Sequence, residues 1–175
     1  AANRLCEALL GAFRAKPSDE VAEGGAEQAE ALASRHPLSI LIAEDNVVNQ
    51  KVALSLLRKL GYGADVVSDG LEAVEAVKRK PYDLVLMDVQ MPSLDGEQAT
   101  IRIRRELPAE RQPWIIAMTA NVMKGDRERY LADGMNEYVP KPIRAEQLRE
   151  VLQAVPPLSG RQGGQTPKPE VNRDL

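Results

Sequence analysis

Acidic residues directly follow two apolar stretches of the sequence. Glu44 and Asp45 come after residues 38–43, and Asp88 follows residues 84–87. Carboxylates gathered at one place repel one another by on the order of 4 kcal/mol per pair at an effective dielectric of about 20, so they require a cation among them. Hard oxygen ligands favour Mg²⁺, with Mn²⁺ as the alternative. The spacing predicts a divalent-cation site made by Glu44, Asp45 and Asp88.

Two more polar side chains follow apolar stretches in the same way. Thr119 comes after residues 114–118, and Lys141 follows residues 137–139 within Pro140-Lys141-Pro142. The hydroxyl and the ammonium could bind the oxygens of a transferring phosphoryl group, which Mg²⁺ also favours. Asp88 is the predicted nucleophile, because aspartyl phosphate is an established covalent form.

The elements that must position these residues alternate as strand then helix, five times along the chain. The expected strands are residues 38–43, 64–67, 84–87, 114–118 and 137–139. Asn46, Ser68-Asp69-Gly70 and Asp95-Gly96 are signals for the starts of helices. The alternation predicts a flavodoxin-like, doubly wound α/β fold, (βα)5, with a five-stranded parallel sheet. All strand ends then meet at one edge, where such sheets bind ligands.

Apolar residues at helical spacing predict the faces that pack on the sheet. The expected inward residues are Val48, Val52, Leu56 and Leu60 in the first helix, Leu71, Val74 and Val77 in the second, Ala99, Ile103 and Leu107 in the third, and Leu148, Val151, Leu152 and Val155 in the last. Residues 120–132 form the fourth expected helix, with a weak apolar stripe and many charges.

Composition narrows the class of protein. With 175 residues, 43% of them hydrophobic, the chain is long enough for one domain with a full core. A net charge of −3 gives no electrostatic indication of nucleic-acid binding. The single cysteine, Cys6, excludes an intramolecular disulfide and a cysteine-based metal cage. His36 is interpreted as a linker residue that nothing nearby orients. Without a membrane-length apolar run or a secretory signal, a cytoplasmic location is expected.

Both ends of the chain differ from residues 38–155. Residues 1–37 are interpreted as a linker or the end of a preceding domain, because a short helical pattern at Leu5, Leu9 and Phe13 is followed by Gly24-Gly25. A helix that docks on the main domain or on a second chain is the alternative. Residues 156–175, rich in Ser, Gly, Gln and Pro, predict a disordered tail or linker. The absence of an initiator methionine suggests a fragment of a longer protein.

Taken together, the motifs resemble receiver domains, the phosphoacceptor modules of two-component response regulators, over about residues 38–155. They are Glu44-Asp45-Asn46, residues 83–88 with Met91-Pro92, Asp95-Gly96, Thr119-Ala120 and Tyr138-Val139-Pro140-Lys141-Pro142. The resemblance implies that Asp88 is phosphorylated and that the backbone carbonyl of Gln90 joins Glu44, Asp45 and Asp88 around Mg²⁺.

The resemblance also assigns roles around the phosphoryl group. Thr119 and Lys141 would bind its oxygens, and Tyr138 would be a switch that turns inward as Thr119 moves. A cis peptide is implied between Lys141 and Pro142. Receivers catalyse their own phosphorylation and dephosphorylation, and Gln90 and Asn121, at the positions that tune phosphoryl loss, suggest a long-lived phosphoryl group.

Other motifs resemble the receivers fused to hybrid sensor histidine kinases: Asn46 and Asn49 after the acidic pair, and residues 123–127 and 134–138. This implies that the parent chain is a histidine protein kinase, with a membrane anchor elsewhere in it left open. The implied partners are a histidine kinase domain and a histidine-phosphotransfer protein, with no nucleic acid and no membrane contact by this fragment. In receivers the surface of the fourth helix, fifth strand and fifth helix commonly meets partners.

Several alternatives stay open at this stage. A stand-alone single-domain response regulator and a weak homodimer are compatible with the sequence. A flavodoxin-like ligand-binding module would share the architecture, but Glu44-Asp45 has the wrong charge for a flavin phosphate. A haloacid-dehalogenase-type phosphatase would need a second acid where Gln90 stands.

Overall fold

The sheet of this protein has the predicted parallel arrangement. The computed structural model describes residues 32–120 and 126–158. The strands are β1 (Ile40–Ala43), β2 (Ala64–Val67), β3 (Leu84–Asp88), β4 (Trp114–Thr119) and β5 (Glu137–Pro140). Their order is β2-β1-β3-β4-β5, and every neighbouring pair is parallel. The flavodoxin-like α/β fold is therefore confirmed, and the strands end at a common edge.

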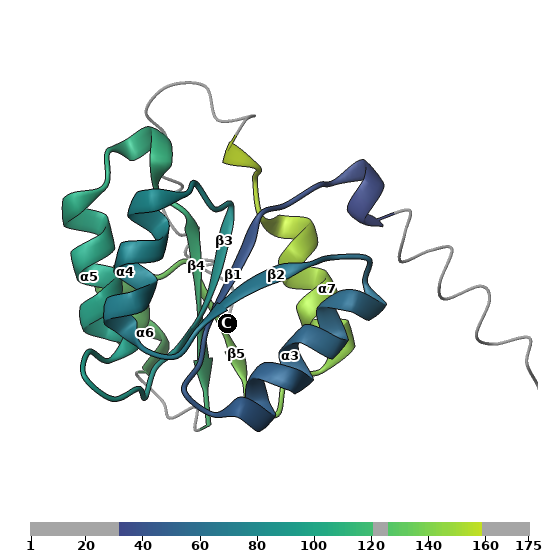
Figure 1. Cartoon of the computed structure of the whole chain (residues 1–175), viewed down its shortest axis with the longest axis horizontal. Coiled ribbons are helices and arrows are strands. Elements are labelled where there is room, and N and C mark those ends of the chain that lie inside the picture. Colours follow the sequence, from purple (N-terminus) through teal and green to yellow (C-terminus); the bar gives the residue numbers. More distant parts are fainter. Residues whose placement is uncertain (1–31, 121–125, 159–175) are drawn as a thin grey trace, which may run out of the picture.

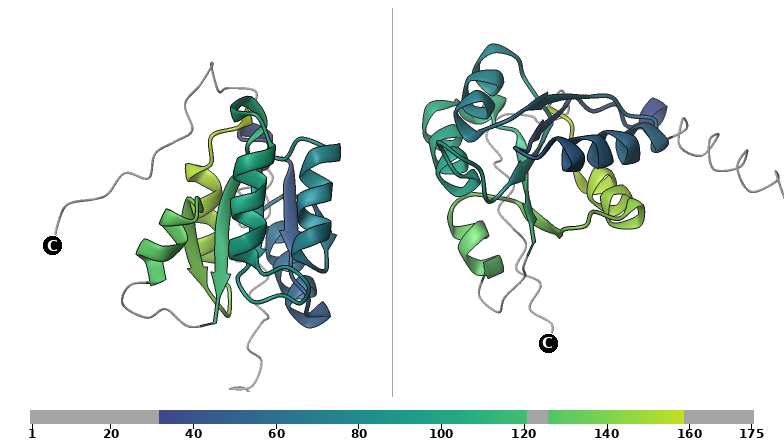
Figure 2. Two further views of the ribbon diagram at one scale, coloured as in Figure 1. Left: turned by 90° about the vertical axis from the view of Figure 1, so that its left-hand side faces the viewer. Right: turned by 60° about the horizontal axis from the view of Figure 1, so that its bottom comes forward.

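Helices cover both faces of the sheet, as Figure 1 shows. The helices α3 (Val47–Lys59) and α7 (Ala145–Ala154) pack on one face. The other face carries α4 (Gly70–Arg79), α5 (Gly96–Glu106) and α6 (Asp126–Ala132), and Figure 2 shows the same layers from two further directions. A short 3-10 helix, η1 (Ala109–Arg111), precedes β4. Within the described residues, no helix is long and apolar enough to cross a membrane.

Two aliphatic cores lie between these layers because alternate strand residues point to opposite faces. Ile42 and Leu86 pack with Leu57 of α3 and Leu148 of α7 on one side. On the other side the strands pack against helix residues that include Val74, Val77 and Ile103. The strands are buried on both faces, which explains their continuous apolar runs.

Three helices begin at capping residues that the sequence identified. Asn46 accepts hydrogen bonds from the backbone N–H of Val48 and of Asn49, at 2.9 and 3.3 Å. Asp69 and Asp95 cap α4 and α5 in the same way, each at 2.8 Å. Asn46 and Asp69 lie within three residues of the strands that precede them, and Asp95 follows the loop after β3, so the caps fix where each helix starts.

The face of α3 differs in part from the prediction. Val48 and Val52, expected to point inward, are 68% and 44% exposed, and the buried residues of the helix are Ala53 and Leu57. The other two expected residues are placed as predicted, because Leu60 is buried and Leu56 packs partly buried against the core. Apolar residues occupy two adjacent stripes of this helix, and the stripe through Ala53 and Leu57 is the one that contacts the sheet. Leu71 of α4, also predicted to be inward, is exposed as well.

The segment before β1 contacts the core under α3 and α7. Residues 32–35 are helical, and Leu32 and Ala33 pack against the core under α3 and α7. The imidazole Nε2 of His36 lies 2.7 Å from the carbonyl oxygen of Val155. The backbone carbonyl of His36 accepts a hydrogen bond from the Tyr62 hydroxyl at 2.8 Å. The expectation that nothing orients His36 was therefore wrong.

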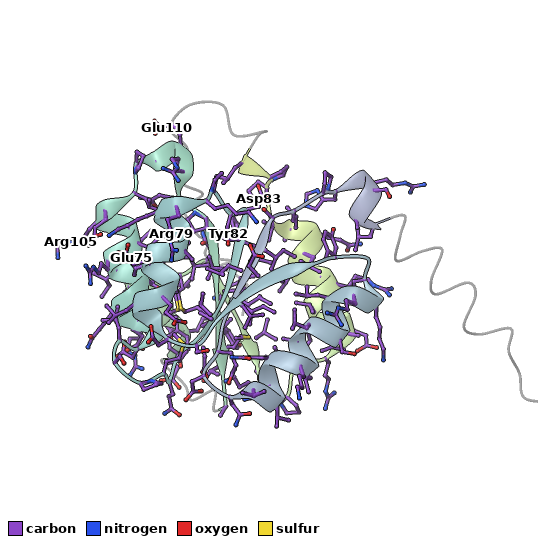
Figure 3. The ribbon with its side chains drawn as sticks, in the orientation of Figure 1. Glu75, Arg79, Tyr82, Asp83, Arg105 and Glu110 are labelled. Carbon is purple, nitrogen blue, oxygen red and sulfur yellow. The ribbon has the colours of Figure 1, made fainter. Side chains whose placement is uncertain are left out.

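Asp83 joins both flanking segments at the amino-terminal edge of the sheet, where Figure 3 labels it. Its carboxylate accepts the backbone N–H of Ser39, just before β1, at 2.7 Å and that of Leu158, after α7, at 2.6 Å. The described parts of both flanking segments are thus fixed at the edge opposite the acidic residues. The predicted helix at Leu5, Leu9 and Phe13 and most of the predicted tail lie outside the described residues.

Candidate active site: an acidic pocket with a central lysine

The three predicted metal-binding carboxylates lie together at the carboxyl edge of the sheet. Each of Glu44, Asp45 and Asp88 offers a ligand oxygen, and these oxygens lie within 4.8 Å of one another. Glu44 and Asp88 are 1% and 5% exposed, whereas Asp45 is exposed to solvent. Hard oxygen donors with one side open to water fit Mg²⁺, which keeps part of its hydration shell.

Lys141 lies between two of these carboxylates. Its Nζ atom is 2.7 Å from Oε2 of Glu44 and 2.7 Å from Oδ2 of Asp88, and its side chain is only 18% exposed. The backbone N–H of Lys141 donates to the carbonyl of Thr119 at 2.7 Å, and the Lys141–Pro142 peptide is cis, as expected. The end of β5 therefore directs this lysine into the pocket.

Burial and the neighbouring charges together shift the pKa values of Asp88 and Lys141. Burial raises the pKa of Asp88 and nearby Glu44 adds to this, although Lys141 opposes both. Burial disfavours the charge on Lys141, but its hydrogen bonds to Asp88 and Glu44 outweigh burial and raise its pKa above the ordinary value. Lys141 is thus protonated at neutral pH. Three carboxylates around one ammonium leave the pocket with an excess of negative charge, which a divalent cation would offset.

The first turn of α3 holds Glu44 in place. Oε1 of Glu44 accepts the side-chain amide of Asn49 at 2.8 Å and the backbone N–H of Asn46 at 3.3 Å. The side-chain amide of Gln50 donates to the backbone carbonyl of Glu44 at 2.7 Å. Sequence reasoning noticed Asn49 only as a subfamily marker and missed its contact with Glu44. The contact could have been predicted from the spacing, because Asn49 follows Glu44 by five positions and the helix cap at Asn46 lies between them.

The loop after β3 is folded tightly against Asp88. Oδ1 of Asp88 accepts the backbone N–H of Gln90 at 3.1 Å, while the Gln90 side chain is exposed. The backbone N–H of Gly96 donates to the carbonyl of Val89 at 3.1 Å. A Cβ atom at Gly96 would overlap the backbone carbonyl of Asp88. Glycine is therefore required for this approach of α5 to the site.

A cavity of about 510 Å³ opens over the acidic residues. Its lining includes Thr119 and Lys141 and, from α6, Arg129 and Tyr130. Tyr138 is half-buried in β5 and packs with the core under α4, α5 and α6, outside the lining of this cavity. Sequence reasoning missed Tyr130, which lay in a stretch that looked merely charged. Asn121 lies outside the described residues.

The fold and the site together define a class of protein. A parallel α/β sheet whose carboxyl edge carries three carboxylates, a lysine and a threonine can hold a divalent cation next to an anionic group such as a phosphoryl group. The response regulator receiver domain family matches residues 40–153, and the chain belongs to this family. It is a receiver domain of two-component phosphorelay signalling.

Similar sequences occur within much longer histidine kinases. Histidine protein kinase 1 of Candida albicans is 41% identical over 133 residues, which are 71% of this chain and 5% of that protein. The signal transduction histidine-protein kinase BarA of Escherichia coli is 37% identical, over 79% of this chain and 15% of that protein. The chain thus spans a small part of the length of these curated relatives.

Solved structures agree with this assignment. The receiver domain of the sensor histidine kinase PA1611 from Pseudomonas aeruginosa, with a magnesium ion in its active-site cleft, is 46% identical with a TM-score of 0.60. The similarity covers 66% of this chain and 94% of that one. A chain in the co-crystal structure of Ypd1 with the receiver domain of Ssk1, from Saccharomyces cerevisiae, is 31% identical with a TM-score of 0.60, over 66% and 86% of the two chains.

Proposed function

We propose that Asp88 accepts a phosphoryl group from a phosphohistidine in a Mg²⁺-dependent reaction. The main support is the contact of Asp88 with Lys141 at 2.7 Å inside the acidic pocket. A carboxylate oxygen of Asp88 forms the new P–O bond as the P–N bond to the histidine breaks, and the departing imidazole nitrogen takes a proton from solvent water. The ammonium of Lys141 compensates the charge on the phosphoryl oxygens.

The residues of the pocket suit the metal that this reaction needs. Glu44, Asp45, Asp88 and the backbone carbonyl of Gln90 would hold Mg²⁺, and Mn²⁺ suits the same oxygen donors. Bound metal would neutralise negative charge and orient the phosphoryl oxygens. Of the acidic side chains, Asp45 is the most open to solvent, so it gives the ion its route of entry.

The neighbouring strands supply the response to phosphorylation. Thr119 ends β4 in the lining of the cavity, and its hydroxyl would donate to a phosphoryl oxygen. Tyr138 lies on the adjacent strand, paired with Ala117, and would turn inward as Thr119 moves. The change would then reach the surface formed by α6, β5 and α7.

Next to the pocket, an apolar patch offers a docking surface for the phosphoryl donor or acceptor. The α3 patch consists of Val47, Val48 and Val52, which are 58%, 68% and 44% exposed in the first turns after Asn46. Three adjacent exposed valines mark an interaction site rather than scattered surface residues. A histidine-phosphotransfer protein docked there would bring its phosphohistidine to Asp88, and the similarity to a chain in the Ypd1–Ssk1 complex supports this partner.

The wider setting proposed for this chain is a cytoplasmic hybrid sensor histidine kinase. Residues 38–155 would form its receiver, residues 1–37 the linker from the preceding kinase domain, and residues 156–175 a tail or linker. Support comes from the long histidine kinases that contain similar segments.

Incubation with acetyl phosphate and Mg²⁺ tests the acceptor. We expect the intact mass of the wild type to rise by one phosphoryl group, and neither Asp88→Asn nor wild type in EDTA to change. An unmodified wild type, even with a phosphorylated histidine-phosphotransfer protein present, would refute the proposal.

The α3 patch is tested with the same reagents. Val48→Ser should slow transfer from a phosphohistidine protein but leave labelling by acetyl phosphate unchanged. Leu71→Ser, an exposed apolar residue on α4, is the matched control and should change neither rate. Equal transfer rates in all three proteins would exclude this docking surface.

A further inference from the structure

Tyr130 contacts the site from the core. Its hydroxyl lies 3.3 Å from Oγ1 of Thr119 and donates a hydrogen bond to it. Tyr130 and Thr119 are 4% and 5% exposed, and both line the cavity over Asp88. A buried phenol requires a hydrogen-bond partner, and the hydroxyl of Thr119 is one that the fold provides.

The two partners differ in their freedom to move. The ring of Tyr130 is packed among the buried residues between the sheet and α4, α5 and α6, which opposes its displacement with Thr119 toward Asp88. Thr119 ends its strand, and its hydroxyl can change direction by rotating between staggered positions about χ1. At 3.3 Å the hydrogen bond is already long for two hydroxyl groups, so a small displacement of Oγ1 breaks it.

We infer that the Tyr130 hydroxyl is a latch that holds Thr119 in its resting position and opposes the movement of its Oγ1 atom toward a phosphoryl group on Asp88. The inference rests on the proposed function, in which Thr119 binds that group. When Thr119 turns toward a phosphoryl group on Asp88, the phenol loses its partner. Since Tyr130 belongs to α6, loss of its hydrogen bond transmits phosphorylation to this helix independently of Tyr138.

The latch is tested with beryllium trifluoride, which mimics a phosphoryl group on a carboxylate. Titration of wild type and Tyr130→Phe in Mg²⁺, followed by NMR at the Thr119 methyl and the Ala120 amide, gives the apparent affinity. A weak neutral hydrogen bond predicts about two- to fivefold tighter binding by Tyr130→Phe. Without the ligand, the resonances of Tyr130→Phe should shift toward those of the bound wild type.

A double-mutant cycle separates the latch from a purely structural effect. In a Thr119→Val background, where no hydroxyl is left to hold, Tyr130→Phe should not change the affinity. The matched control is Tyr62→Phe, because Tyr62 is also 4% exposed and its hydroxyl bonds a carbonyl at the other edge of the sheet. The affinity of Tyr62→Phe for beryllium trifluoride and its NMR resonances near Thr119 should equal those of the wild type.

The possible failures have different causes. If the wild type binds beryllium trifluoride but Tyr130→Phe binds it equally or more weakly, the latch is refuted and the phosphoacceptor role stands. The same conclusion follows if Tyr130→Phe has its full effect in the Thr119→Val background. A wild type that does not bind the probe in Mg²⁺ refutes the proposed function and the latch with it.

Discussion

Replacing Lys141 by methionine tests the electrostatics of the pocket directly. Methionine keeps an apolar stem of similar length but removes the ammonium that contacts Glu44 and Asp88, each at 2.7 Å. These carboxylates are 1% and 5% exposed, so water from the cavity replaces the lost partner poorly. A buried charge left without its partner costs about 3–5 kcal/mol. We expect Lys141→Met to lower the free energy of unfolding by about this amount when no divalent metal is present.

The loss should depend on pH in a defined direction. Burial already raises the pKa of Asp88, and removing Lys141, which lowers it, raises that pKa further. A carboxyl group whose pKa is higher in the folded state favours folding while it is protonated, and this contribution is lost as pH rises through the folded-state pKa. The deficit of Lys141→Met should therefore be larger at about pH 8 than at about pH 5. Millimolar Mg²⁺ should recover part of it by supplying positive charge.

Urea unfolding followed by circular dichroism, in EDTA and in Mg²⁺ at both pH values, measures these differences. Lys80→Met is the control, because Lys80 contacts Asp65 at 2.8 Å but the two side chains are 55% and 54% exposed. An exposed pair of this kind contributes less than about 1 kcal/mol. The electrostatic description of the pocket is wrong if Lys141→Met is as stable as the wild type in EDTA. It is also wrong if the loss of unfolding free energy in Lys141→Met changes with neither pH nor Mg²⁺.

Two further variants test the scaffold around the site. Asp83→Ala removes the charged acceptor of the N–H groups of Ser39 and Leu158, so urea unfolding should show a loss of about 2–4 kcal/mol in the free energy of unfolding. Asp83→Asn keeps an acceptor oxygen and should lose less. Wild-type stability in Asp83→Ala would contradict this role. Gly96→Ala should destabilise by about 1–3 kcal/mol and weaken Mg²⁺ binding in calorimetry, because its methyl group overlaps a backbone carbonyl at the site. Gly63→Ala, whose Cβ would meet nothing within 4 Å, should leave Mg²⁺ binding unchanged, and equal binding by both alanine variants would disprove the steric argument.

Much of the site followed from sequence because the physics of parallel sheets is simple. Once Glu44, Asp45 and Asp88 were placed after strands that run in the same direction, they had to lie at one edge of the sheet, and the pairing of β1 with β3 brings them together. Strand β2 has the predicted bounds of residues 64–67, since Gly63 precedes it and Ser68-Asp69 follow its two valines as turn and capping signals.

Contacts between distant residues could not be found in this way. His36 meets Val155 across 119 positions through a backbone carbonyl, which every residue possesses and which leaves no signal in the sequence. The hydrogen bond from Tyr130 to Thr119 depends on how α6 lies over the sheet, and a charged stretch gave no reason to expect it.

The exposure of Val48 and Val52, which were predicted to point inward, has a functional explanation. This helix carries two neighbouring stripes of apolar residues, one through Val48 and Val52 and one through Ala53 and Leu57. Within each stripe the residues repeat every four positions, so the periodicity alone cannot decide which stripe faces the sheet. The fold buries Ala53 and Leu57 and leaves Val47, Val48 and Val52 exposed at the end nearest the pocket. Valine is a poor helix former, so neither helix stability nor core packing explains three of them there. A partner that covers them while its histidine reaches the pocket would explain their position and why the simplest pattern failed at this helix.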